Sequence, residues 1–173
     1  MVIETAHSPG DQRLALVELY DAALPEVYGY LATRTGSIAD AEDLTSETFL
    51  AAADAVRRHS VPELSVAWLI GVARHKLVDH WRRREREQRP LTALAGDDAR
   101  VDSWDVEIDA ITARTVLGTL GAHHRSALTL RYLDGLPVRQ VADLLGRTEG
   151  ATEVLLVRAK AAFRAAYPEE GLS

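Results

Sequence analysis

The sequence predicts an all-α protein: two small helical domains, at residues 11–88 and 108–167, joined by an acidic, flexible linker at 89–107. Good helix formers dominate the 173 residues, and alternating runs of β-branched residues are absent. Apolar residues recur every three or four positions on both sides of the linker. Within residues 91–110, six acidic side chains accompany one basic one, and large apolar residues are scarce.

In the first domain, the pattern predicts three helices. The first spans about Asp11 to Arg34, with a bend or break at Pro25, and Thr35-Gly36-Ser37 stops it and caps the next. The second runs to about His59, and the third from about Ser65 to Arg86, apolar at first and basic afterwards. The predicted core residues of the first two helices are Leu14, Val17, Leu24, Val27, Leu31, Leu44, Phe49, Ala52 and Val56.

The second domain contains the spacing of a helix-turn-helix. A short helix from Val138 to Leu145 ends at Gly146, and Thr148 caps a longer helix that continues to about Ala166. An ordinary helical hairpin has the same spacing. The residues expected to face inward are Val138, Val141, Ala142, Leu145, Thr152, Leu156, Ala159 and Phe163.

Charge is segregated along a chain whose net charge is −6. Residues 71–90 carry seven basic and three acidic side chains, which fits either local binding of a polyanion or a solvated helix end. The absence of cysteine excludes disulfides and thiolate metal sites. Without a signal pattern or an apolar run of spanning length, we expect a cytosolic protein with no membrane insertion.

Two clusters of side chains suggest partners. Arg74 and Lys76 stand near Trp68, His75 and Trp81, a mixture of cations and flat rings that suits unstacked bases, although tryptophans are more often core residues. Asp40, Asp43 and Glu47 share one helical face, which favours either a basic protein partner or simple interaction with the helix N-terminus.

Three segments, in order, resemble the sigma factors of RNA polymerase, specifically the small two-domain extracytoplasmic-function (ECF) group. The resemblance covers about residues 12–166. The segments are Asp40 to Phe49, Trp68 to Arg83, and Leu130-Arg131-Tyr132-Leu133-Asp134-Gly135-Leu136.

The resemblance implies a transcription initiation factor whose partners are core RNA polymerase and promoter DNA, with an anti-sigma factor as a further partner and a monomer as the free state. The residues implied for polymerase docking are Asp40, Asp43, Ser46 and Glu47. Those implied for the −10 element are Val61, Glu63, Ser65, Trp68, Arg74, His75, Lys76, Arg82, Arg83 and Arg84. Those implied for the −35 element are Arg147, Thr148, Glu149, Glu153, Val154, Arg158 and Lys160. The acidic linker is similar to the segment that threads polymerase channels.

The sequence departs from the family pattern at three places. Ser46 stands where glutamine is usual, and His75 where asparagine is usual. The predicted outer face of the last helix begins with Glu149, Glu153, Val154 and Leu155, although helices that read DNA usually carry basic or amide side chains there.

Two other functions stay open from the residues alone. A helix-turn-helix regulator that acts without stoichiometric polymerase binding would use residues 122–166 but leaves the Trp68 to Arg84 stretch without a purpose. A metalloenzyme would have to use His75, Asp79 and His80, yet no HExxH motif or third ligand is evident. We therefore expect no enzyme, no cofactor and no metal site.

Overall fold

The computed structural model describes residues 9–88 and 110–167, and all of its regular elements there are helical. The chain divides into two compact units, residues 1–77 and 78–173, and helix α3 (Val66–Gln88) runs through the boundary. The predicted linker at 89–107 lies outside the described residues. None of the described helices combines the length and the apolarity that crossing a membrane requires.

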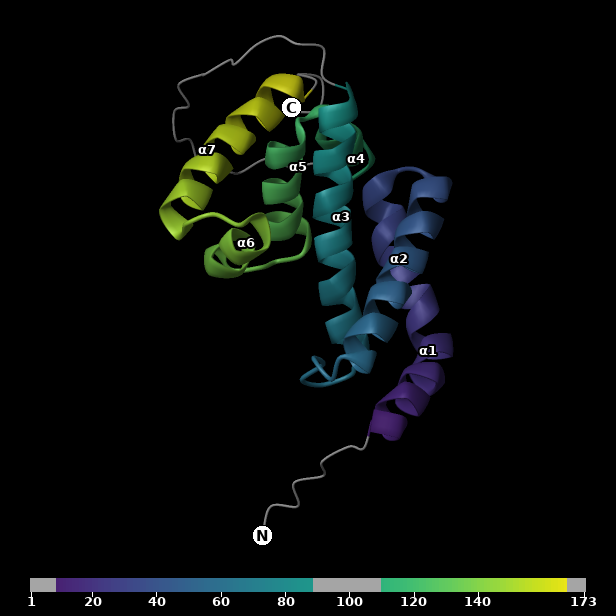
Figure 1. Cartoon of the computed structure of the whole chain (residues 1–173). Coiled ribbons are helices and arrows are strands. Elements are labelled where there is room, and N and C mark those ends of the chain that lie inside the picture. Colours follow the sequence, from purple (N-terminus) through teal and green to yellow (C-terminus); the bar gives the residue numbers. More distant parts are fainter. Residues whose placement is uncertain (1–8, 89–109, 168–173) are drawn as a thin grey trace. The chain divides into compact units, whose positions relative to one another are not determined.

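The first unit is built on two helices that lie side by side, α1 (Pro9–Thr35) and α2 (Ile38–Arg57), together with the first half of α3 (Figure 1). The turn between α1 and α2 is the predicted one. Gly36 adopts a φ of +70°, which glycine tolerates best, and the Ser37 hydroxyl accepts the Asp40 N–H at 3.2 Å as an N-cap.

Helix α1 differs from prediction in two ways. It continues through Pro25 without a break. The proline removes the donor for the Asp21 carbonyl, but both residues are exposed, so that carbonyl can bond to water. Leu14 and Val17 are 60% and 69% exposed, so their placement in the core was wrong.

Val27 and Leu31 are fully buried as predicted, and so is Ala23. Near the start of α1, Leu16 and Leu19 are half-buried in place of Leu14 and Val17. Because apolar residues surround the start of this helix on several sides, spacing alone allowed either pair to face the core, and packing selected Leu16 and Leu19. In α2, Leu44, Ala52 and Val56 are buried as predicted, whereas Phe49 is half-buried against Tyr20, with ring centroids 4.7 Å apart.

The second unit holds the end of α3 and the predicted helix-turn-helix. Its elements are α4 (Ala110–Thr119), α5 (Ala122–Leu128), the π-helical turn η1 (Thr129–Leu133), α6 (Val138–Leu145) and α7 (Glu149–Ala166). Gly146 ends α6 with a φ of +62°, and the Thr148 hydroxyl accepts the Ala151 N–H at 3.2 Å. The turn and the cap are therefore as predicted.

Two buried clusters hold this unit together. One joins α5, η1, α6 and the start of α7 with Val78 of α3, and the other joins α4, α5 and the end of α7. All the residues predicted to face inward are buried except Val138, which is half-buried. Leu155, expected on the outer face, is only 9% exposed and belongs to the first cluster, so the exposed face of α7 is narrower than the sequence indicated.

Candidate polymerase and DNA interfaces

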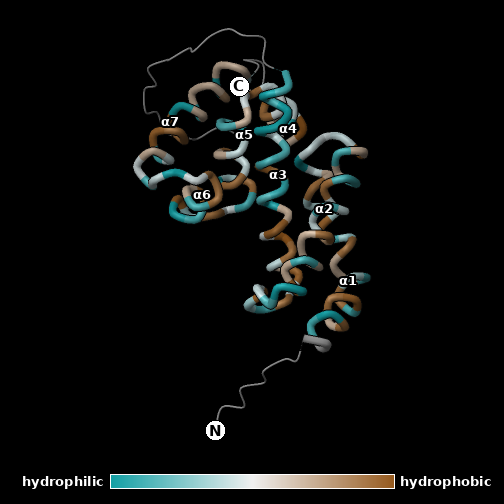
Figure 2. Tube along the Cα trace, viewed as in Figure 1, coloured by the Kyte–Doolittle hydropathy of each residue, from teal (hydrophilic) through white to brown (hydrophobic). Residues whose placement is uncertain are grey.

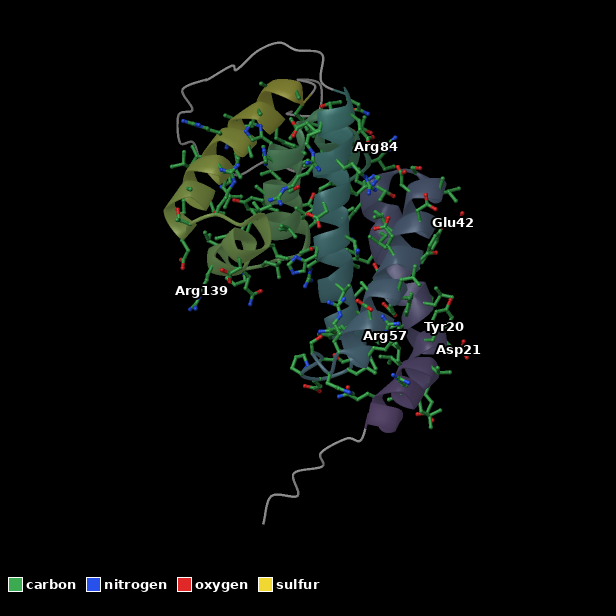
Figure 3. All side chains as sticks on the ribbon, in the orientation of Figure 1. Tyr20, Asp21, Glu42, Arg57, Arg84 and Arg139 are labelled. Atoms are coloured by element: carbon green, nitrogen blue, oxygen red, sulfur yellow. The ribbon has the colours of Figure 1, made fainter. Side chains whose placement is uncertain are left out.

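One side of α2 carries an acidic face, which we define as Asp40, Asp43, Ser46 and Glu47. The opposite side of the helix buries Ala41, Thr45 and Ala52. Asp43 and Ser46 are exposed, while Asp40 and Glu47 are half-buried. All four residues predicted for polymerase docking are therefore accessible on one unit. Figure 3 shows Glu42, which borders this face one turn before Ser46, also extending into solvent.

Cations and an apolar side chain border the acidic face. The Lys76 Nζ atom of α3 lies 3.8 Å from Oε2 of Glu47, and Asp54 pairs with both Arg57 and Arg58. A groove of about 640 Å³ runs between these residues, and Leu50, 70% exposed, lines it. Sequence reasoning missed Leu50, although its spacing of seven from Asp43 places it on the same helical face.

The loop and the start of α3 carry the residues predicted for the −10 element in the first unit. Glu63 and His75 are exposed, and Trp68, Arg74 and Lys76 are half-buried. The Ser65 hydroxyl accepts the Trp68 N–H at 3.2 Å and so helps to start α3. Val61 is the exception, because its side chain is only 6% exposed and presents no surface to a base.

A tyrosine joins two of the cations in this unit. The guanidinium carbon of Arg34 lies 3.9 Å from the centre of the Tyr30 ring, and that of Arg74 lies 5.9 Å from it. Such a cluster combines positive charge with a flat ring, the two features that single-stranded nucleic acid requires. Sequence reasoning missed Tyr30, since only the packing of α1 brings it near Arg74.

The remaining basic residues of α3 belong to the second unit, where the helix is strongly hydrophilic (Figure 2). Arg82 donates to the Leu145 carbonyl at 2.8 Å, whereas Arg83 and Arg84 are exposed. Trp81 is a core residue, 5% exposed, with the Arg125 guanidinium 4.6 Å above its ring. Of the two tryptophans on α3, therefore, Trp68 is the one with substantial accessible surface.

The exposed surface of α7 and its preceding turn includes six of the seven residues predicted for the −35 element. Lys160 is the half-buried one, and its Nζ atom lies 5.0 Å from the centre of the Tyr132 ring. The six exposed residues are Arg147, Thr148, Glu149, Glu153, Val154 and Arg158.

Two side chains of α5 have a lowered pKa. Burial lowers the pKa of His124, His123 and Arg158 lower it further, and Glu85 partly opposes them. Burial, followed by the charge of Arg84, lowers the pKa of Arg125. Within residues 9–88 and 110–167, no group of three or more His, Cys, Asp or Glu is placed to hold a metal ion.

In comparison with known protein families, two separate parts of the chain each match a family. Residues 19–87 match "Sigma-70 region 2", and residues 112–163 match "Sigma-70, region 4". The first match covers α2 and almost all of α3, and the second covers the helix-turn-helix.

Curated relatives give the same family. The chain is 30% identical over 162 residues to the ECF RNA polymerase sigma factor BldN of Streptomyces coelicolor, a match that covers 90% of this chain but 61% of the relative. It is 31% identical to the ECF RNA polymerase sigma factor SigC of Mycobacterium tuberculosis, with 90% of this chain and 85% of the relative covered. The ECF sigma factor SigM of Bacillus subtilis is 28% identical, with 89% and 96% covered.

A solved structure is similar in fold. The sigma factor RpoE of Bartonella quintana, determined in complex with the anti-sigma factor NepR, matches with a TM-score of 0.55 and 20% identity. The match covers 88% of this chain and 96% of that one.

Proposed function

Because this chain belongs to the ECF group of RNA polymerase sigma factors, we propose that it uses the acidic face of α2 to dock on core polymerase and one surface on each unit to select promoters. The single observation that carries the docking assignment is that Asp40, Asp43, Ser46 and Glu47 are all accessible on one side of α2. A negative surface of this kind suits a basic partner.

The DNA assignments divide between the two units. In the first, Trp68, His75 and the Tyr30–Arg34–Arg74 cluster supply rings and cations for the unstacked bases of a melted −10 element. In the second, α7 enters the major groove of the −35 element. Polymerase tethering raises the effective concentration of each DNA contact, so neither unit needs high affinity alone.

The proposed mechanism requires no bond to be made or broken by this chain. Holding an extruded base costs a few kcal/mol of lost stacking, which pocket contacts and backbone charge offset. The linker at 89–107, rich in carboxylates, is proposed to follow a basic polymerase channel. Since transcription by bacterial polymerase takes place in the cytoplasm, the proposal also locates the protein there; an anti-sigma factor is the proposed regulator.

A regulator that acts without polymerase is not favoured, because region 2 as well as region 4 matches and because the acidic face of α2 would then have no partner. We expect the free chain to be monomeric. Gel filtration of the purified protein checks this, since a stable dimer that binds palindromic duplex without polymerase would support the regulator instead.

The docking proposal is tested by reversing charge on α2. Asp43→Lys should lower the affinity for core polymerase by at least about tenfold, since a close charge pair at an interface contributes about 1.5 kcal/mol or more. Asp21→Lys is the matched control, because Asp21 is also an exposed carboxylate but lies on α1, outside the acidic face (Figure 3). Binding is measured with labelled full-length chain, and circular dichroism confirms that both variants fold. Equal loss in both variants, or none in Asp43→Lys, would refute the assignment.

A further inference from the structure

The exposed start of α7 carries acceptors and methyl groups but no cation. Glu149, Glu153 and Val154 are exposed there, with Val154 at 51%. No lysine or arginine occurs between Arg147 and Arg158. A helix that enters the major groove in this way cannot use the arginine–guanine pairing that is the commonest specific contact.

Glu153 has no structural role that explains its position. It follows the first turn of α7, where the benefit of negative charge at a helix N-terminus has faded, whereas Glu149 lies within that turn. In the described part of the chain, no ion pair engages Glu153. The side chain is exposed, so its carboxylate is available to a ligand of the outer face.

A carboxylate in the major groove distinguishes the bases by their donors. A carboxylate only accepts hydrogen bonds. It is therefore repelled by the base atoms that are acceptors themselves, namely guanine N7 and O6 and thymine O4. Adenine offers an N6 donor beside the N7 acceptor, whereas cytosine offers its N4 donor alone. Cytosine is therefore the base that Glu153 fits best.

The neighbouring side chain and the flanking cations complete the surface. Val154 presents methyl groups, and the apolar partner in the major groove is the C5-methyl of thymine. Arg147 precedes the cap of α7 and Arg158 lies more than two turns into the helix, so these exposed cations flank Glu153 and Val154 and can contact phosphates on both sides of them. These cations offset the repulsion between Glu153 and the backbone.

We propose that the −35 element of this protein's promoters contains a C·G pair whose cytosine N4–H₂ donates to the Glu153 carboxylate, beside a T·A pair whose thymine methyl contacts Val154. This inference rests on the proposed function of α7. It makes Glu153 and Val154 the specificity-determining residues of the second unit.

The test uses the full chain with purified bacterial core polymerase. Transcripts from a genomic template pool first identify a strong promoter, and the six positions of its −35 element are then randomised. Sequencing the transcripts gives the base preference at each position. The variants are Glu153→Gln and Val154→Ala, with Asp143→Asn as the control because it removes one exposed negative charge from α6 and leaves α7 unchanged.

The wild-type protein is expected to select cytosine at one position, beside a thymine. Glutamine pairs with adenine N6 and N7, so Glu153→Gln should move the preference at that position from cytosine to adenine by about tenfold. Val154→Ala should weaken the thymine preference several-fold and leave the cytosine preference intact. Asp143→Asn should select the same element as the wild type.

Two results would overturn the proposal. One is an element without a preferred cytosine. The other is a Glu153→Gln variant that transcribes more from every template with unchanged base frequencies, since this would mean that Glu153 only repels phosphates. If no template is transcribed selectively even by the wild type, the proposed function itself fails, and that outcome is distinct from both.

Discussion

The Lys76 Nζ atom lies 3.8 Å from Oε2 of Glu47, and this ion pair joins a residue assigned to the −10 element with a residue assigned to polymerase docking. The two side chains retain 33% and 41% of their exposure, so water screens the attraction and its contribution to stability is small. The pair therefore orients two side chains with proposed functional roles more than it holds the fold together.

Exchanging the charges of Glu47 and Lys76 separates the contribution of this ion pair to stability from the proposed role of Glu47 in polymerase docking. Glu47→Lys places two ammonium groups together and should lower the free energy of unfolding by about 0.5 kcal/mol. Adding Lys76→Glu should restore that stability, because the attraction is re-formed with reversed polarity. Polymerase affinity should stay low in the double variant, since position 47 remains positive. Urea unfolding and polymerase binding measure the two quantities, and recovery of both would contradict the docking role of Glu47.

Acid should destabilise the second unit through His124. Its pKa in the folded chain lies below the ordinary 6.5, chiefly because it is partly buried, so the unfolded chain takes up the proton first. The free energy of unfolding should consequently fall as the pH drops from above 6.5 through the folded-state pKa.

The check compares urea unfolding of the wild type with His124→Gln at pH 7.5 and pH 5.5. Glutamine does not titrate, so the variant should lose less stability between the two conditions. His124 remains in His123→Gln, and so does its burial, the larger cause of its lowered pKa, so this second variant should keep more of the pH dependence than His124→Gln does. An unchanged pH dependence in His124→Gln would show that other groups account for it.

The cap of α7 should contribute to the stability of the second unit. Thr148→Ala removes the acceptor for the Ala151 N–H and should cost about 1 kcal/mol of unfolding free energy. Thr148→Ser keeps the hydroxyl and should cost less than half as much. Thermal unfolding of the two variants measures the difference, and equal losses would indicate that the methyl group matters more than the cap.

Arg158 should contribute to promoter affinity through phosphates. Arg158→Gln removes one phosphate contact, so the slope of log K against log salt for holoenzyme on promoter DNA should become shallower by about one unit, with base preference unchanged. Arg114→Gln, an exposed change on α4 outside the helix-turn-helix, should leave the slope as it is. A shift in base preference in Arg158→Gln would assign Arg158 to base readout instead.

Local chemistry made much of this protein predictable from its sequence. The stops and caps at Gly36, Ser37, Gly146 and Thr148 depend on φ angles and hydrogen bonds within a few residues, so each occurs where the sequence indicated. The inward face of α6 followed in the same way from helical spacing. The order and spacing of the three family segments also determined the class of the protein.

Only the tertiary structure decided which apolar and aromatic residues are buried. The sequence analysis placed Leu14 in the core of the first unit and Leu155 on the outer face of α7, and it treated Trp68 and Trp81 alike. Packing buried Leu155 and Trp81 and left Leu14 exposed. The physical reason is the distance along the sequence over which each interaction acts. A helix cap forms hydrogen bonds within its own turn. Burial depends on residues far away in the sequence, such as Arg125 above Trp81, which only the folded chain brings together.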